Sequence, residues 1–453
     1  MTSRLFSADT FEVSLRSRWR ASLFLLVLGL GGCGLGRLAI RTAIAARLSE
    51  SLAPSDLRRA LSLDPGNPVI YNRLGVAFSF LQEQSIPSDG LPYLRRAVQL
   101  NPDETISWLN LASACESTGD LPCADEAFSH ALAASPMVPR IQWTVANYYL
   151  RTERPAEARA RFRRLLSMGP EYSLATFQTC FRAFPDMELL VREVLPEGKD
   201  PTPRLALINF LCSQGEVDNA QRVWALAMKE ASPPSFLAVR PFLASLIQSG
   251  KFGEAWTVWQ DLIRTGVVSQ PPTRNSENLV YNGDFEQVPL NGGFDWMYRE
   301  QPYLAVDVQS LGSPDGGRCL RLDFTVSQNQ EYEPVQEFVA VMPRQSYTIS
   351  GYVRAQDITS DSGPRLRVVD AACPHCLEVS TESVVGTRDW SPTSVTFTTG
   401  AETRFVRLSV WRPRSRTYPM EISGNFWLDR IMLSPAQEPG APNPVVPPQG
   451  VPR

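Results

Sequence analysis

The pattern of apolar and polar residues changes twice along the chain and predicts three kinds of region. Residues 21–36 are uncharged, as a membrane-spanning or signal segment would be. From about residue 50 to 266, apolar residues recur at the spacing of helices that bury one face. From residue 278 to 435, short stretches alternate between apolar and polar residues, as half-buried strands do. We therefore expect a multidomain chain in which α-helices precede an antiparallel β-sandwich.

The uncharged stretch near the N-terminus is slightly short for a full membrane span. Arg37 follows it, but a long basic side chain can reach the membrane surface, and residues 38–46 continue a plausible helix. We predict a transmembrane anchor over residues 21–46. The basic N-terminal segment, residues 1–20, favours a cytoplasmic N-terminus. Three arginines on the far side of the uncharged stretch weaken this argument: Arg37, Arg41 and Arg47.

A second interpretation of the N-terminus is a lipoprotein signal. Leu30, Gly31, Gly32 and Cys33 resemble a bacterial lipobox, in which Cys33 would be lipidated after cleavage. Both interpretations place the protein on a membrane, facing an extracytoplasmic space. The first implies a single-pass protein of the bacterial inner membrane that faces the periplasm.

The helical region contains a repeat that is marked by its prolines. Pro65, Pro102, Pro136 and Pro170 follow one another after 37, 34 and 34 residues. A period of 34 residues resembles the tetratricopeptide repeat, a pair of helices that stacks into an α-solenoid. The clearest unit matches the family's spacing at Trp108, Leu111, Ala112, Gly119, Ala124, Phe128, Ala131 and Pro136.

The expected packing of this unit follows from side-chain size. Ala124 and Ala131 should allow two helices to approach closely, with larger apolar side chains around the contact. Gly119 should end the first helix in a left-handed conformation. Cys115 stands where the family often has an aromatic residue. The array is expected over residues 50–266, with an irregular part at 171–200 and a linker at 267–277.

The β-region resembles the jelly-roll, galactose-binding-like carbohydrate-binding modules. Residues 278–286 are similar to the opening strand of that family and residues 426–433 to its closing strand. The resemblance covers residues 278–435 and implies a sandwich, with Trp296 and Trp390 in the core. The proline-rich residues 436–453 are expected to be a disordered tail.

The same resemblance implies a structural calcium ion between the first and last strands. Glu286 and Asp429 occupy the matching positions, and carboxylates together with backbone carbonyls suit this hard cation. The alternative is that both are ordinary solvated or hydrogen-bonded carboxylates.

Strand alternation nominates residues for sugar binding. Trp411 and Arg407 fall on the polar phase of residues 405–411, and Tyr352 and Arg354 on that of residues 347–354. Arg321 and Asp323 are on the polar phase of a third strand. Aromatic and charged groups together suit a glycan, although the solvent faces of sheets often hold both.

Other features argue against catalysis and nucleic-acid binding. The formal charge of −3 creates no strong field, and only two histidines are present. Cys373 and Cys376 have the spacing of a redox motif, but they lie between two predicted strands, where a local disulfide or free thiols are expected. Cys115 and Cys123 could pair, although buried free thiols are the expectation.

The whole arrangement resembles membrane-anchored repeat proteins found with bacterial exopolysaccharide export systems. That resemblance implies a non-catalytic scaffold with a protein or peptide bound to the repeats and a polysaccharide bound to the sandwich. A structural adaptor without glycan binding and a glycan-active enzyme remain alternatives.

Overall fold

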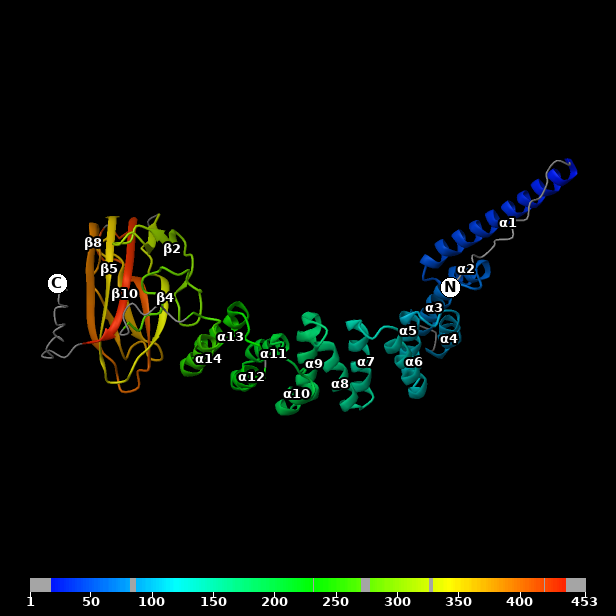
Figure 1. The fold of residues 1–453 in the computed structure, drawn as a ribbon, viewed down its shortest axis with the longest axis horizontal. Helices are drawn as coiled ribbons and strands as arrows, with labels where there is room; N and C mark the ends of the chain where they lie inside the picture. Colours follow the sequence, from blue (N-terminus) through cyan, green and yellow to red (C-terminus); the bar gives the residue numbers. More distant parts are fainter. Residues whose placement is uncertain are drawn as a thin grey trace, which may run out of the picture. The chain divides into compact units, whose positions relative to one another are not determined.

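The computed structural model describes residues 18–81, 87–230, 232–269, 278–325, 329–418 and 420–436 (Figure 1). These residues form two compact units that divide between Tyr172 and Ser173. The predicted N-terminal segment up to residue 17, most of the predicted linker and nearly all of the tail lie outside the described residues. The expected fold class is confirmed, because helices precede two antiparallel sheets.

The described part of the first unit consists of helices and the short segments that connect them. Its α-helices are α1 (Arg18–Glu50), α2 (Pro54–Leu63), α3 (Pro68–Val76), α4 (Leu91–Leu100), α5 (Thr105–Ser117), α6 (Leu121–Ala134), α7 (Pro139–Arg151) and α8 (Pro155–Leu166). A π-helical turn, η1 (Ala77–Leu81), and two 3-10 turns, η2 (Pro87–Gly90) and η3 (Pro170–Tyr172), complete it.

The first helix is long and apolar enough to cross a membrane. Within α1, the segment Ser22–Glu50 contains an 18-residue stretch with a mean hydropathy of 2.0, and none of that stretch is buried against the rest of the chain. A helix of this length and composition near the N-terminus is compatible with a membrane anchor or a signal sequence.

The pair α5 and α6 shows why the repeat forms. Ala112, Ala124 and Ala131 are fully buried between helices, because small side chains allow close approach. Gly119 has a φ of 77°, the left-handed conformation that ends α5. Asp120 then caps α6 by accepting a hydrogen bond from the Cys123 amide at 3.2 Å.

Four further residues belong to the predicted unit. Leu111 and Phe128 are buried. Trp108 is only half-buried; its ring stacks on His130 at 4.2 Å, and its Nε1 donates to the Pro102 carbonyl. Pro136 follows the C-cap residue of α6, where a proline cannot interrupt the helix.

The second unit begins with six helices and continues into the sandwich. The helices are α9 (Ser173–Ala183), α10 (Met187–Glu193), α11 (Thr202–Ser213), α12 (Val217–Glu230), α13 (Phe236–Gln248) and α14 (Phe252–Arg264). Gly215 lies between α11 and α12, and Gly250 lies between α13 and α14. Their φ values of 78° and 71° are left-handed, so each glycine follows the end of a helix as Gly119 does after α5.

The sandwich consists of two five-stranded antiparallel sheets. Sheet A has the order β1 (Met297–Tyr298), β4 (Tyr332–Ala340), β9 (Phe405–Arg412), β6 (Arg365–Asp370) and β7 (Glu378–Ser380). Sheet B has the order β2 (Leu304–Leu311), β3 (Arg318–Phe324), β10 (Gly424–Pro435), β5 (Ser346–Ile358) and β8 (Gly386–Thr398). The apolar phases of both sheets meet in one core.

Two expectations for the sandwich need correction. Residues 281–284 form a turn instead of a regular opening strand, although the Leu279 amide donates to the Leu433 carbonyl of β10. Trp296 is fully buried as expected. Trp390, in contrast, is only partly buried on β8, because this edge strand places it at the rim, where its Nε1 donates to the Gly312 carbonyl at 3.1 Å.

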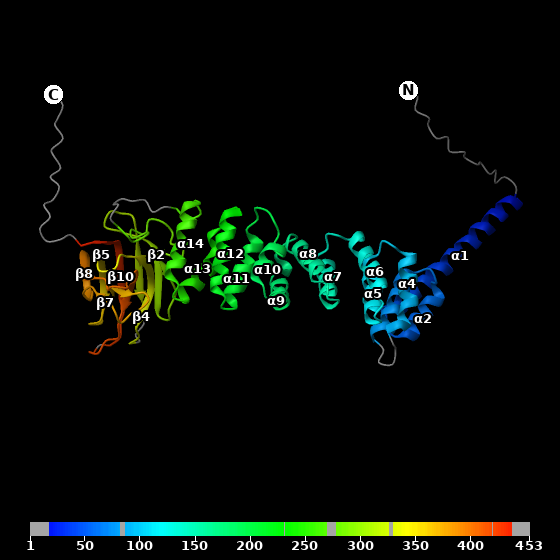
Figure 2. The ribbon, with the colours of Figure 1, turned by 90° about the horizontal axis from the view of Figure 1, so that it is seen from below.

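The last two helices pack against the sandwich (Figure 2). Phe252 at the start of α14 lies 5.2 Å from Phe338 and 5.9 Å from Phe405, measured between ring centroids. Trp259 contacts the Tyr281 ring at 5.4 Å and faces Gly293, where an added Cβ would come within 2.5 Å of the indole. The helices α13 and α14 therefore belong to the same compact unit as the sheets.

Candidate functional site

The candidate glycan residues lie on two separate surfaces. Trp411 and Arg407 belong to β9 of sheet A, whereas Tyr352, Arg354, Arg321 and Asp323 belong to strands of sheet B. Each residue is on the polar phase of its strand, opposite the buried residues of that strand. Because the inner faces of the two sheets pack together, the two sets cannot form one binding site.

The first surface surrounds Trp411 on the outer face of sheet A, and we call it the Trp411 face. Its members are Trp411, Arg365, Arg367, Arg407, Glu331 and Glu333. The Arg367 guanidinium lies 4.4 Å from the centroid of the Trp411 ring, and that of Arg365 lies 5.7 Å from it. The Trp411 Nε1 donates to a Glu331 carboxylate oxygen at 2.6 Å. The indole is thus held in place by two arginines of β6 and by Glu331, which immediately precedes β4.

Glu333 connects the residues of this face. Its Oε1 accepts a hydrogen bond from the Ser409 hydroxyl at 2.6 Å. The same oxygen lies 3.5 Å from an Arg407 nitrogen and 3.6 Å from an Arg367 nitrogen. Arg367 also pairs with Glu378 of β7 at 2.7 Å. These contacts fix the arginines and leave the aromatic ring beside a row of polar groups.

A recess of about 300 Å³ adjoins the Trp411 face. Its walls are formed by Met297, Tyr298, Arg299, Glu333, Pro334, Gln336 and Arg407. Glu333 and Arg407 belong both to this recess and to the Trp411 face, so the two are continuous. An aromatic residue, a recess and fixed polar groups are what binding of a small polar ligand requires.

Arg412 organises the loops at the Trp411 end of sheet A. It is 1% exposed, and its guanidinium donates to the carbonyls of Ser362, Gln330 and Met420. It also donates to the Asn329 and Ser360 side chains. One buried cation therefore ties three loops together, and its desolvation lowers the pKa of the guanidinium.

The second surface lies on the outer face of sheet B, and we call it the Trp427 face. Trp427 is covered by the guanidinium groups of Arg354 and Arg321, at 4.9 and 5.3 Å from the ring centroid. Asp323 pairs with Arg321 at 2.6 Å. Because both arginines lie over the indole, Trp427 is only 8% exposed.

Tyr352 is the accessible aromatic residue of the Trp427 face. It is 37% exposed, and the Arg430 guanidinium lies 5.7 Å from its ring centroid. Arg430 in turn pairs with Asp315 at 2.7 Å. The recess of about 300 Å³ is lined by Glu333 and Arg407 and not by Tyr352, so it belongs to the Trp411 face.

The two candidate calcium ligands differ in environment. Asp429 is 1% exposed, and its Oδ1 has no hydrogen-bond partner. Burial raises the pKa of this carboxyl to about 6. Glu286 accepts a hydrogen bond from the Arg318 amide at 3.0 Å. Among the described residues no group of three or more His, Cys, Asp or Glu side chains is placed to hold a metal ion, so backbone carbonyls would have to complete such a site.

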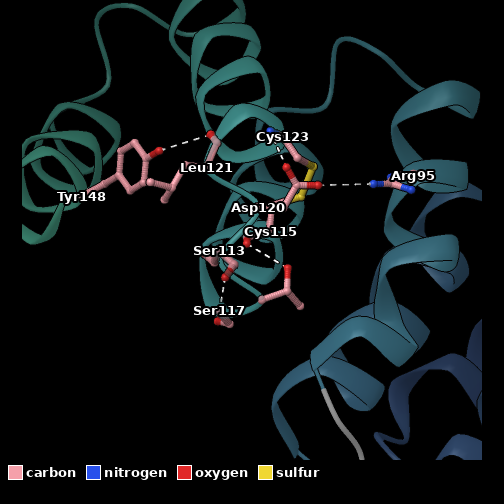
Figure 3. The surroundings of a disulfide bond; sticks show 9 residues. Arg95, Ser113, Cys115, Ser117, Asp120, Leu121, Cys123 and Tyr148 are labelled. Carbon is pink, nitrogen blue, oxygen red and sulfur yellow. Dashed lines mark hydrogen bonds and ion pairs between the residues drawn. A yellow bond between two sulfur atoms is a disulfide. The ribbon is translucent and has the colours of Figure 1, made fainter.

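The structure contains two disulfides. Cys373 and Cys376 form a disulfide within the loop after β6. A local disulfide was one of the two expectations for them, and free thiols were the other. Cys115 and Cys123 are also paired, which corrects the expectation of buried free thiols (Figure 3). The sharp turn between α5 and α6 brings these two cysteines together, with their Cα atoms 5.7 Å apart.

The first helices of successive repeat pairs carry polar side chains that contact one another. The Asn110 amide of α5 donates to the Asn72 side chain of α3 at 2.9 Å. Arg151 of α7 makes a two-point contact with Glu116 of α5, at 2.7 and 3.0 Å. These side chains form a polar surface that extends over three repeats and could contact a polypeptide.

Comparison with known protein families finds a match within the helical region. The tetratricopeptide repeat family model matches residues 81–139. No curated protein sequence matches the chain.

Similar solved structures resemble parts of the chain at low identity. A CBM4 structure is 16% identical and covers 35% of this chain and 99% of its own, with a TM-score of 0.27. A family 16 carbohydrate-binding module is 17% identical, with coverages of 34% and 99% and a TM-score of 0.24. PilF of Pseudomonas aeruginosa is 17% identical, with coverages of 51% and 93% and a TM-score of 0.27. The chain thus contains a segment, residues 81–139, that matches the tetratricopeptide repeat family model, and its helices are followed by a β-sandwich.

Proposed function

We propose that this protein is a non-catalytic, membrane-anchored scaffold. In this proposal the helical repeats bind a protein or peptide partner, and the Trp411 face of the sandwich binds a glycan. A chain that joins these two activities at a membrane would serve extracellular polysaccharide assembly or export. The anchor would be α1 in the bacterial inner membrane, with the repeats and the sandwich in the periplasm; lipidation at Cys33 is the alternative form of attachment.

The disulfides support the extracytoplasmic placement. Disulfides persist in oxidising compartments and are rare in the cytosol. Cys115–Cys123 lies in the repeats and Cys373–Cys376 in the sandwich, so both parts carry one. A periplasmic or extracellular location is consistent with both.

The observation that carries the glycan proposal is the continuous Trp411 face. Sugars are bound by stacking one ring face on an aromatic side chain while polar groups contact the hydroxyls. Trp411 provides the ring, and Glu331, Glu333 and Arg407 provide acceptors and donors within the same hydrogen-bonded set. The adjoining recess of about 300 Å³ would take part of the ligand.

Calcium is a further part of the proposal. Asp429 and Glu286 would hold the ion with backbone carbonyls, and the ion would fasten the N-terminal segment of the sandwich to β10. The buried, unpartnered Oδ1 of Asp429 fits such a role. If this is right, calcium should raise the melting temperature of the wild type and EDTA should lower it, whereas Asp429→Asn should respond to neither.

Binding of the full-length protein in detergent to immobilised oligosaccharides tests the glycan proposal. Trp411→Ala should abolish measurable binding, because it removes the stacking surface and one donor to Glu331. The matched control is Tyr352→Ala on the opposite sheet, which should leave binding unchanged. If Tyr352→Ala lost glycan binding and Trp411→Ala kept it, the glycan site would lie on the Trp427 face. A wild type that binds no oligosaccharide would favour a structural adaptor.

A further inference from the structure

The outer face of sheet A is closed at one end by the helical array. Phe338 of β4 and Phe405 of β9 point away from the sandwich core, on the same side of the sheet as Arg407. Phe252 of α14 packs on both rings, and Phe294 contacts Phe405 at 5.9 Å. Helix α14 therefore forms a wall across this end of the face.

The other end of the face is open at Trp411. Arg407 lies next to the covered phenylalanines, and Trp411 is four positions further along β9. At the rise of a β-strand, the accessible part of β9 between them is roughly 13 Å long. A ligand that lies along the strand must enter from the Trp411 end and stop at the wall.

The open end also has an excess of positive charge. Arg367 and Arg407 are paired with Glu331, Glu333 and Glu378. Arg365 has no ion-pair partner among the described residues; the nearby Asp361 carboxylate instead accepts the Ser415 hydroxyl. In the loop after β9, Arg414 and Arg416 are exposed and likewise have no ion-pair partner within the described part of the chain.

Three arginines of the Trp411 face each have one hydrogen-bond donor without an acceptor. The Nε atoms of Arg365, Arg367 and Arg407 are buried and have no acceptor. Buried donors of charged groups normally have partners, because leaving them unpaired is costly. A carboxylate on the ligand would instead pair with the guanidinium of Arg365, the one arginine of the three without a carboxylate partner of its own.

We propose that the Trp411 face binds the acidic end of a polysaccharide chain. The chain ends at the wall that α14 forms, a uronic-acid-type sugar near that end contacts Trp411, and the carboxylate of this sugar pairs with Arg365. This inference rests on the proposed glycan-binding function. It adds two properties of the ligand: a carboxylate and a chain end.

The charge requirement is tested with full-length protein in detergent and matched pairs of oligosaccharides, glucuronic against glucose and galacturonic against galactose oligomers. The wild type should bind an acidic member at least about 10-fold more tightly than its neutral partner, the effect of one charged hydrogen bond. Arg365→Gln should remove this preference, so that acidic and neutral oligomers bind with equal affinity. The matched control is Arg321→Gln, which also removes an arginine over a tryptophan and should change nothing.

Each outcome of this experiment has a separate meaning. Equal binding of acidic and neutral oligomers would overturn the charge requirement while leaving glycan binding intact. Loss of preference in the Arg321→Gln control would assign the acid to the Trp427 face and overturn the inference. Binding of neither class would overturn the inference together with the proposed function.

The chain-end requirement is tested by competition with the acidic polysaccharide from which the bound oligomer derives. Mild hydrolysis multiplies the chain ends without changing the mass of sugar. Competition at equal mass should increase in proportion to the number of ends. Competition that depends only on mass would show that internal segments bind and that α14 is not a wall.

Discussion

Phe252→Ala tests whether α14 is part of the sandwich unit. The Phe252 ring is 8% exposed and lies within 6 Å of two rings of sheet A. Truncation of a buried phenylalanine to alanine costs about 3–5 kcal/mol, and the lower end applies here because the ring is not fully enclosed. A loss of about 3 kcal/mol corresponds to a more than 100-fold rise in the local opening equilibrium.

Hydrogen exchange in a fragment of residues 173–436, which includes the described part of the second unit, is the assay. Phe252→Ala should accelerate exchange in β4 and β9, since its ring covers Phe338 and Phe405. The matched control is Phe242→Ala, because Phe242 is also a buried phenylalanine but lies in α13 and packs on Trp224 of α12. The control should affect α12 and α13 and leave β4 unchanged. Unchanged exchange in β4 and β9 of Phe252→Ala would refute the packing of α14 on the sheet.

Four further predictions concern stability and attachment. Reduction of Cys115–Cys123, or its replacement by two serines, should destabilise the repeats by about 2 kcal/mol in urea unfolding; equal midpoints for the oxidised and reduced protein would contradict the pairing. Ala124→Leu should overpack the α5–α6 contact and cost about 1–3 kcal/mol, whereas an unchanged melting curve would contradict its burial. Burial raises the pKa of the Glu337 carboxyl well above 4.5, so the folded state holds the proton more tightly and stability should fall as the pH rises above that value. Glu337→Gln should flatten this pH dependence, and an unaltered slope would assign it to other groups. Full-length protein should fractionate with membranes; release by Cys33→Ala would identify a lipoprotein, and retention a spanning helix.

Local patterns predicted much of the fold. The proline spacing located the helix pairs because each proline must lie outside a helix interior. Strand alternation placed Tyr352 and Trp411 on polar faces because one side of each strand is buried. Alternation does not state which strands pair, so it could not separate sheet A from sheet B.

The features that sequence reasoning missed depend on distant contacts. In the sequence, Phe338 and Phe405 look like ordinary core residues because both are large and apolar. Only the position of α14 shows that they face outward onto a helix. The pairing of β4, β9 and β6 brings four charged residues close to Trp411: Arg365, Arg367, Glu331 and Glu333. The charged alternation of residues 365–367 and 331–333 was visible in the sequence, but their register against Trp411 was not.

The most direct test of the central claim is a hydrogen-exchange footprint of the bound ligand on the full-length protein. A uronic-acid oligomer selected in the binding assay would be added at saturation. Exchange should slow in β6 and β9 and in the loop that Arg412 holds after β9, and it should stay unchanged in β5 and β10. Protection of β5 and β10 with β6 and β9 unaffected would contradict a glycan site on the Trp411 face.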